Sequence, residues 1–462
     1  MLKNVKHGKP PINKKWKIFN IINSIVILAI LGFYLGRMYH YYNLENGKTE
    51  QKDILLADKM KSNPSLIDLE NGLISNEDGT YTYKGSVTNN YILYSGRVFR
   101  ALSIDKDNNV SAISEDSQTL LVANINSEYQ KSYSFNWLNT VEGDANSGVF
   151  ANSLNDITTN LTYTNTCLDK VDDLSNIKCE VVNKEQYVSL LSLKQYQDAN
   201  GAKSFLNNGT NWWLNTTNSN NKMYYVASDG GITTNKFDTI VHNIRPVITF
   251  NNKVIITSGS GAKNDPFVIE ARKLTTLTDA SVGNHVLFSK HNWVVTKKDD
   301  TGVTLLLDTN LKVEDKEFTS PYGDSVMSLD TTLGKYLNND FFNSLSGKDN
   351  VLDNEWYNGK ISAYSKFNYV DALNSKFSGK VGLLKYGDLF VGKNIDSFIL
   401  TRPFGDNDTI YHVNKEGILF SDLIKNAHGF APVIKVNKDL EITSGDGSIA
   451  NPLELKEVTN GQ

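Results

Sequence analysis

The chain reads NIRPVITFNNKVIITSGSGAKNDPFVIE at Asn243–Glu270 and closes with FAPVIKVNKDLEITSGDGSIANPLELK at Phe430–Lys456. Each stretch has an apolar, β-branched run that begins at a proline, then a polar turn, a second apolar run, and SGxG and NDP or ANP turns. Apolar runs bounded by turn-forming residues predict strands, and the turns predict the end of a sheet. The duplication therefore predicts two related domains, each closed by this segment.

Three further blocks recur in the same order along the chain. They pair Tyr91–Ile113 with His285–Leu307, Val188–Gly201 with Val381–Lys393, and Met223–Ile232 with Ile410–Leu419. An ordered set of this kind predicts two homologous domains in tandem, at residues 81–272 and 273–462. Two long copies are too few for a solenoid. We expect an α+β class, with mixed sheets and a short helix in each Val188–Gly201-type block.

Net charge separates the N-terminus from the rest of the chain. Residues 1–17 hold six lysines and no acid, so the remaining residues carry 41 basic against 51 acidic side chains, or about −10. A surface of that sign repels phosphate backbones, which argues against a nucleic-acid partner.

The lysine-rich start precedes an apolar stretch, Ile18–Gly36, whose clearly polar side chains are Asn20, Asn23 and Ser24. Nineteen helical residues reach roughly 28 Å, which is about one hydrocarbon thickness. We predict a transmembrane signal-anchor at 18–36, with residues 1–17 cytoplasmic and the bulk extracellular. A cleaved signal peptide is the alternative, but no A-x-A-like site follows. Residues 37–80 are polar and predict a stalk with a short helix.

The two cysteines of the chain, Cys167 and Cys179, follow the predicted anchor. Beyond a membrane, two thiols separated by a short loop favour a disulfide. Free structural thiols are the main alternative. A redox or metal site is disfavoured, because C-x-x-C is absent and two thiols make half a zinc site.

The ordered blocks NNYILYSGRVFRAL, VSLLSLKQY, NWWLNTT, YYVASDGGI, IRPVI and TSGSGAKNDPFVI resemble a bacterial family of surface domains of unknown function in low-GC Gram-positive organisms. The resemblance covers most of residues 81–270 and, more weakly, 283–456. It implies domains that follow a single membrane anchor. More distantly, WW…SDG…RPV is similar to the C-type-lectin-like scaffold of formylglycine-generating-enzyme-type domains. The cysteine pair of that active site is missing, so the resemblance implies the fold without the oxidase chemistry.

Catalytic and metal-binding signatures are absent from the sequence. The run Asp105–Asn109 has Val110 where a calcium loop needs glycine, which favours a plain hairpin turn. His285 and His291 lie six residues apart without a carboxylate to complete a metal site. No nucleophile elbow, zinc-protease helix or phosphate loop occurs. We therefore predict no metal, no cofactor and no enzymatic activity.

Trp212, Trp213 and Arg245 are the candidate ligand-binding residues. Adjacent tryptophans in a strand point to opposite faces, so one can fill the core while the other reaches a ligand. An arginine beside them can stack on an indole or clamp a carboxylate. The alternative is a packed aromatic with a structural cation–π contact. Aligning Trp212 with Phe398 and Arg245 with Ala431 predicts that the first repeat carries the binding.

Three functional classes remain for such a chain. We favour a cell-surface binding module that engages a peptide, a glycan or another envelope protein. A structural scaffold of the envelope is the second class, and an enzyme acting on wall polymers is the third. An exposed aromatic groove would support the first class, and fully buried tryptophans the second.

Overall fold

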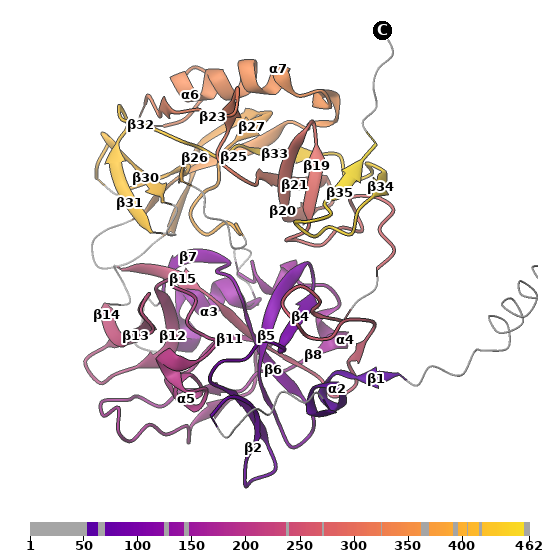
Figure 1. Ribbon diagram of the computed structural model, residues 1–462. Coiled ribbons are helices and arrows are strands. Elements are labelled where there is room, and N and C mark those ends of the chain that lie inside the picture. Colours follow the sequence, from indigo (N-terminus) through magenta and orange to yellow (C-terminus); the bar gives the residue numbers. More distant parts are fainter. Residues whose placement is uncertain are drawn as a thin grey trace, which may run out of the picture. The chain divides into compact units, whose positions relative to one another are not determined.

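The computed structural model is shown in Figure 1, coloured from indigo to yellow along the chain. The following residues are described: 53–62, 70–123, 129–142, 147–236, 240–269, 272–324, 326–361, 369–390, 396–403, 405–414 and 418–456.

The predicted class, α+β with a transmembrane helix and two C-type-lectin-like domains, is wrong. The structure is mostly β-sheet, with 39% strand and 13% helix. The predicted span Ile18–Gly36 lies outside the described residues, and within them no helix is long and apolar enough to cross a membrane. The reason lies in the local pattern, since β-branched and aromatic runs alternate with turn formers and leave helices only a few residues each.

Repeat 1 is built on a main sheet whose strands are far apart in the sequence. Along the sheet they are β11 (Val188–Leu190), β16 (Pro246–Phe250), β6 (Val110–Ser114), β5 (Arg97–Ile104), β3 (Tyr81–Lys84) and β2 (Gly72–Ser75). Three further strands lie off this path. The strand β8 (Leu161–Thr162) pairs with β16. The strand β4 (Tyr91–Tyr94) pairs antiparallel with β5 and parallel with β18 (Phe267–Val268). The β18 strand is the end of the first duplicated stretch.

The main sheet of repeat 2 shares six strands with that of repeat 1, whereas β2 and β3 have no counterpart among its described residues. Its order is β27 (Val381–Gly382), β33 (Val433–Val436), β21 (Gly302–Leu307), β20 (His291–Asp299), β19 (His285–Phe288), β35 (Leu453–Leu455) and β34 (Ile442–Ser444). The β19–β35 pair is parallel, as β4–β18 is, and the other matching pairs are antiparallel. Both long hairpins also carry a bulge at the same place, at Ala101/Ser103 and at Val295/Lys297.

The closing turns of the duplicated stretches are matched in detail. Gly259 and Gly445 adopt φ of +96° and +92°, and a Cβ at either would lie 1.9 or 2.0 Å from the carbonyl oxygen of Pro266 or Pro452. In each repeat the carbonyl of the second glycine of SGxG, Gly261 or Gly447, accepts a hydrogen bond from the first strand of the hairpin. The near-identical sequences thus fold the last strand back onto the first.

Asparagines pair with the edge strand of each main sheet in the same way. The Asn139 side chain donates to Val188 O at 2.8 Å and accepts from Val188 N at 3.1 Å. Asn338 makes the same two bonds with Val381, both at 3.0 Å. Each asparagine sits in or just after a helix, α3 (Tyr133–Leu138) in repeat 1 and the π-helical segment η4 (Tyr336–Phe341) in repeat 2. One side chain therefore satisfies both backbone groups of an edge residue.

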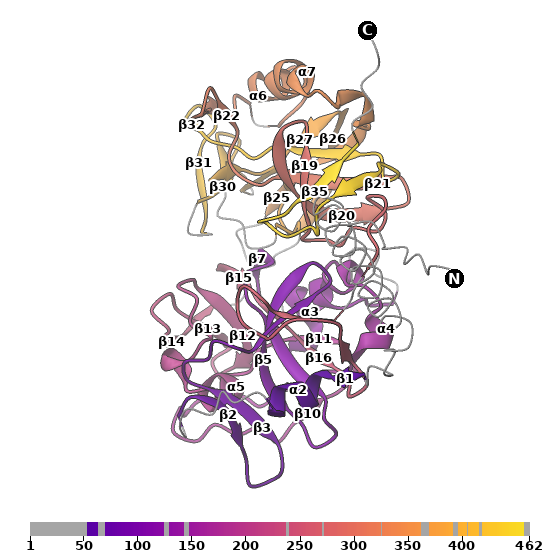
Figure 2. The same cartoon turned by 45° about the vertical axis from the view of Figure 1, so that its right-hand side comes forward.

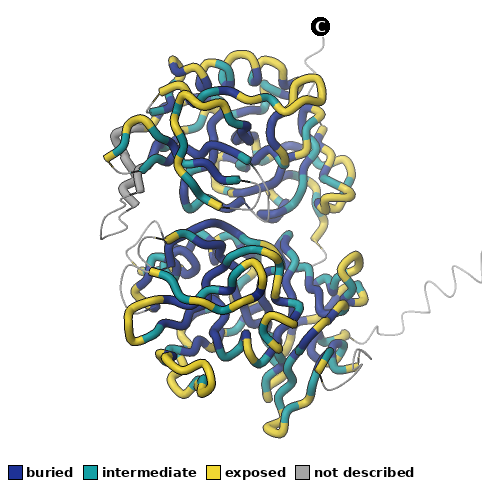
Figure 3. The backbone as a smooth tube through the Cα atoms, turned by 60° about the vertical axis from the view of Figure 1, so that its left-hand side comes forward, coloured by how far each residue is buried: buried dark blue, intermediate teal, exposed yellow. Residues whose placement is uncertain are grey.

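A smaller sheet completes each repeat. In repeat 1 its order is β14 (Ile232–Lys236), β13 (Lys222–Val226), β12 (Trp212–Thr217), β15 (Val241–Ile244) and β7 (Thr119–Val122). The first three of these strands lie side by side in Figures 1 and 2. In repeat 2 the counterparts are β28 (Ser397–Phe398), β30 (Thr409–Val413) and β31 (Leu419–Leu423), with β32 (Ala427–His428) on β24 (Ser320–Pro321). The buried segments of each repeat, dark blue in Figure 3, follow these sheets.

Part of the predicted stalk belongs to repeat 1. The strand β1 (Ile54–Leu55) pairs with β17 (Ile255–Ile256), and the helix α2 (Leu56–Ser62) buries Leu56, Ala57 and Met60. The β2–β3 hairpin follows from Gly72 onward. The folded unit therefore begins at Ile54, because the apolar residues that suggested an isolated helix pack against the core.

The repeats differ most where the chain approaches the edge strand of the main sheet. Repeat 1 inserts β8 (Leu161–Thr162), β9 (Thr166–Cys167) and β10 (Val182–Asn183), and repeat 2 inserts the hairpin β25 (Asn354–Ile361) and β26 (Tyr369–Gly379). After the edge strand, repeat 1 forms α5 (Leu193–Asp198) with a Ser192/Gln195 capping box. The helix that we expected at the same place in repeat 2 is absent, and a turn at Lys385–Asp388 replaces it.

We predict that the closing glycines cannot carry a side chain. Gly259→Ala and Gly445→Ala force a Cβ into a backbone carbonyl, so each variant loses several kcal/mol of unfolding free energy in urea titrations. Gly209→Ala is the matched control, because its φ is +77° and no atom lies within 4 Å of an added Cβ. That control loses only the conformational penalty of about 1–2 kcal/mol. Equal losses in all three variants would contradict the proposed clash.

Candidate functional site

The three candidate residues lie in the interior of repeat 1. Trp212, Trp213 and Arg245 are each 0% exposed. The two indoles leave β12 on opposite faces, as expected for neighbours in a strand, but both faces are covered. Trp212 packs in a cluster with Leu206 and Tyr196, whereas Trp213 belongs to the main core.

Trp212 and Arg245 form a stacked pair. The guanidinium carbon lies 4.9 Å from the indole centroid. Arg245 Nε donates to Ser114 O at 3.0 Å and Nη1 donates to Leu206 O at 2.6 Å, so the side chain joins three segments of the repeat. Burial lowers the pKa of Arg245 to about 10, and the group stays positive at neutral pH. These contacts describe a structural cation inside the scaffold.

Trp213 is the centre of a second aromatic group. Its ring lies 5.9 Å from Tyr225 and 4.5 Å from His242, and those two rings are 4.2 Å apart. Its Nε1 donates to Leu121 O in β7 at 3.0 Å. Burial lowers the pKa of His242 to about 4, which keeps the imidazole neutral at pH 7.

Strand pairing corrects our alignment of the second repeat. Trp212 pairs with Val226, and the residue opposite Val413, the counterpart of Val226, is Ser397 rather than Phe398. Trp213 therefore corresponds to Phe398, and Trp212 to Ser397. Sequence similarity missed this shift because it matched the first apolar residue of each strand, Trp212 and Phe398.

The Trp212–Arg245 pair is replaced as a unit in repeat 2. At the two corresponding positions Ala431 N donates to Ser397 Oγ at 2.9 Å. A cation–π stack in one copy thus corresponds to a short hydrogen bond in the other. Paired replacement at a buried contact is typical of packing. The ligand-binding role of Trp212, Trp213 and Arg245 stays a prediction, and their burial favours the structural alternative.

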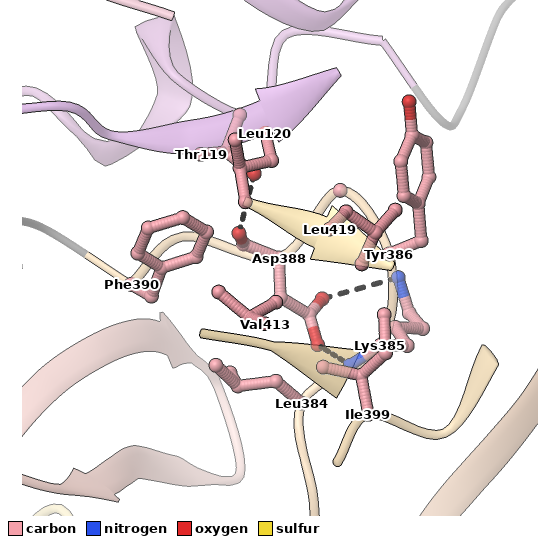
Figure 4. A pocket seen from close by; sticks show the side chains of 11 residues that line it. Thr119, Leu120, Leu384, Lys385, Tyr386, Asp388, Phe390, Ile399, Val413 and Leu419 are labelled. Carbon is pink, nitrogen blue, oxygen red and sulfur yellow. Dashed lines mark hydrogen bonds and ion pairs between the residues drawn. The ribbon is translucent and has the colours of Figure 1, made fainter. Parts of the chain in front are cut away.

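The loop that replaces α5 in repeat 2 contacts repeat 1. Trp137 Nε1 donates to Gly387 O at 2.8 Å, Val122 N donates to the Tyr386 hydroxyl at 2.8 Å, and Thr119 Oγ1 donates to Asp388 O at 2.9 Å. Figure 4 shows the last of these bonds, with Asp388 also bound to Lys385. The edge strand β7 therefore ends against a segment of the other repeat.

The cavity at this contact is small. It is lined mostly by apolar side chains of both repeats, including Leu120, Ile399, Val413 and Leu419, and encloses about 270 Å³ together with its open mouth. Pockets for small molecules usually measure about 300–1,000 Å³. We interpret the contact as packing between the repeats.

A larger groove of about 590 Å³ lies open to solvent beside α5. Its polar lining residues already have local partners. Asp105 accepts from the backbone of Asp107 and Asn109 in the β5–β6 turn, Gln195 belongs to the capping box, and Asp198 pairs with Lys194. The Asp105 contacts are those of the hairpin turn that we favoured over a calcium loop.

The remaining candidates are separated in space or engaged elsewhere. His285 and His291 lie at opposite ends of the β19–β20 pairing, and His285 Nδ1 is 3.4 Å from Asp308 Oδ2. Within the described ranges, no group of three or more His, Cys, Asp or Glu side chains is placed to hold a metal.

Cys167 and Cys179, the pair expected to bond, form a disulfide with a Cα–Cα distance of 5.2 Å. Hydrogen bonds tie the inserted loop to the small sheet, from Val171 N to Thr217 O and from the Tyr224 hydroxyl to Val171 O. The loop nevertheless leaves large apolar side chains in solvent. They are Tyr163 (52% exposed), Leu174 (45%), Val181 (56%) and Val182 (36%).

Sequence reasoning missed this surface, because a polar loop with scattered valines carries no periodic signal. It also missed a pair of histidines in repeat 2, His412 and His428. The aligned blocks place Tyr225 opposite His412, but the contact between the two histidines depends on packing. The strand β31, which pairs antiparallel with β30, lies between His412 and His428 in the sequence.

No protein-family model, curated protein or solved structure matches the chain. The resemblance to surface domains of low-GC Gram-positive bacteria stays a prediction.

We predict energetic coupling between the two residues of the buried stack. Trp212→Ser alone costs about 3–5 kcal/mol of unfolding free energy, as large-to-small core changes do. Arg245→Ala alone leaves two buried carbonyls unpaired. The double variant recreates the repeat 2 pair, so its loss falls short of the sum by about 0.5–3 kcal/mol in a double-mutant cycle. Strict additivity would show that the two side chains act separately.

A pH dependence follows from His242. Its pKa is about 4 in the folded state against 6.5 for an unperturbed histidine, so the unfolded state binds the extra proton first. The stabilisation is complete above about pH 6.5 and is lost as the pH falls toward 4. His242→Phe removes this contribution, and urea titrations between pH 7 and 4.5 will show a shallower loss of stability than in the wild type. An unchanged dependence of the unfolding free energy on pH would show that groups other than His242 cause the acid sensitivity.

Proposed function

We propose that this chain is a binding protein of the cell surface, which recognises an envelope peptide, glycan or protein through the insertions that its two repeats carry. One observation supports this proposal above the others. The two copies share six strands of the main sheet, which in repeat 1 are β11, β16, β6, β5, β4 and β18, yet they insert different structures at one equivalent place, before β11 and before β27. Divergent loops on a common rigid scaffold are where recognition residues concentrate.

The insertion of repeat 1 has the better surface for a partner. Four large apolar side chains are exposed within residues 163–182, and the Cys167–Cys179 disulfide restrains the loop that carries Leu174. Restraint lowers the entropy that a partner must overcome on binding. This modifies our earlier expectation, because the first repeat still carries the binding, but through its loop rather than through Trp212, Trp213 and Arg245.

The proposed location outside the cytoplasm rests on the same loop. Disulfides persist in oxidising compartments and are rare in reducing ones. Cys167 is buried in β9 and Cys179 sits in a polar loop, so the bond ties the loop of the insertion to the strand β9.

A structural role in the envelope is the second candidate. The contacts of Tyr386, Gly387 and Asp388 with repeat 1 favour it, because they hold the two repeats together without enclosing a ligand-sized space. The complete burial of both tryptophans also suits a spacer.

Binding to isolated envelopes separates the two candidates. We predict that Leu174→Ser with Val181→Ser weakens binding of the full-length protein to envelope fragments by at least fivefold, as loss of a hot-spot residue of more than about 1 kcal/mol would. Ile449→Ser is the matched control, because Ile449 is 69% exposed in a closing turn. Unchanged melting temperatures would exclude misfolding. Equal binding by all variants would disprove recognition through this loop, and no binding by the wild type would favour the spacer.

A further inference from the structure

The small sheet of repeat 2 encloses two histidines among aromatic rings. His412 on β30 and His428 on β32 have ring centroids 4.4 Å apart. Phe398 lies 5.5 and 5.3 Å from them, and Phe420 lies 4.8 Å from His412. His412 is 1% exposed, whereas His428 reaches the surface in part.

Each histidine faces a carboxylate of its own. His428 Nε2 lies 2.6 Å from Asp422 Oδ2 in a hydrogen bond. His412 Nε2 lies 3.0 Å from Asp396 Oδ1, but outside hydrogen-bond geometry, and its Nδ1 has no partner. The charged and titratable groups that act on His412 are Asp396 before β28, Asp422 on β31 and His428 on β32. The other rings that pack on it are phenylalanines.

At the corresponding positions, repeat 1 has one histidine instead of two. Trp213, Tyr225 and His242 occupy the places of Phe398, His412 and His428, as strand pairing establishes. Repeat 2 has therefore exchanged a tyrosine for a second imidazole at the buried position. For packing alone an aromatic ring suffices there, whereas an imidazole adds a site that can gain a charge.

We propose that His412 and His428 form a pH-sensitive latch, which keeps the small sheet of repeat 2 closed at neutral pH and loosens it on acidification. Protonating His412 in place buries a charge beside the ring of His428, with its nearest carboxylate poorly aligned. Separation of β30 from β31 and β32 lets water and Asp396 solvate the new charge. The protonated form thus favours the open arrangement.

The pH window follows from burial of His412. Burial lowers its pKa to about 4 in the closed state, whereas a solvated histidine titrates near 6.5. The open state binds the proton first, so closure is complete above about pH 6.5 and weakens as the pH falls toward 4. Between pH 7.5 and 5 the opening equilibrium rises on the order of tenfold or more.

The latch also lies next to the contact between the repeats. Val413, the neighbour of His412 in β30, and Leu419 of β31 line the apolar cavity that includes Thr119 and Leu120 of β7. Figure 4 shows these side chains converging on the same space. Opening of β30 and β31 therefore withdraws apolar side chains from repeat 1.

Hydrogen exchange measured by mass spectrometry tests the latch in the full-length protein at pH 7.5 and 5. After correction for intrinsic exchange, peptides covering Thr409–Leu423 should open at least tenfold more often at pH 5. Peptides from β12 and β13 of repeat 1, which pack on the single His242, give the response of a sheet without the histidine pair. His412→Tyr, which copies the residue of repeat 1, should reduce the response of repeat 2 to the level of those peptides.

Equal protection of β30 and β31 at both pH values would overturn the proposal. So would a His412→Tyr variant that still opens like the wild type. If His412→Tyr does not fold, His428→Gln is the substitute variant, because glutamine keeps a donor for Asp422. Its β30 and β31 peptides should show a smaller increase in exchange at pH 5 than those of the wild type. Imidazole NMR of the wild type is independent of both variants. A His412 titration below that of a solvated histidine is expected, and an unperturbed His412 titration near pH 6.5 would overturn the latch.

Discussion

The constraint on which each repeat depends is the packing of the SGxG glycine against a proline carbonyl. The carbonyl oxygens of Pro266 and Pro452 lie so close to Gly259 and Gly445 that a Cβ at either glycine would clash with them. The positive φ of each glycine turns the chain back on itself. This turn lets β18 and β35 run parallel to β4 and β19. A parallel pair between the first hairpin and the last strand closes the sheet over a long loop, so the intervening residues are free to vary.

That freedom explains which parts of the fold could be predicted. The duplication, the strand blocks and the hairpin at Asp105–Asn109 follow from turn residues and from β-branched runs, which are local signals. The absence of a helix at Lys385–Asp388 does not, because VGLLKYGDL has a helix-like spacing that packing against repeat 1 overrides. The residues at 54–62 were assigned to the stalk for the same reason, since burial of Met60 depends on strands that are distant in the sequence.

The candidate site shows more clearly what cannot be predicted from the sequence. Residue type correctly placed Trp212 and Trp213 on opposite faces of a strand, but a sequence does not say whether a face is covered. Both are, and the arginine between segments bonds to Ser114 and Leu206 carbonyls rather than to a partner. The aligned blocks already placed Tyr225 opposite His412. The one-residue error in aligning Phe398 hid that Phe398 pairs with His412 as Trp213 pairs with Tyr225.

Comparison of the two copies therefore distinguishes residues that the fold requires from residues that are free to take other roles. Positions where both repeats preserve one geometry, such as Asn139 and Asn338, satisfy the backbone of the scaffold. Positions where one copy substitutes a linked pair, such as Ser397 with Ala431, preserve packing by other means. The inserted loops and His412 fit neither description. The inserted loops add exposed apolar surface, and His412 adds a titratable ring, at positions where the other copy folds without them. Because folding does not require these features, they are the best candidates for functional residues.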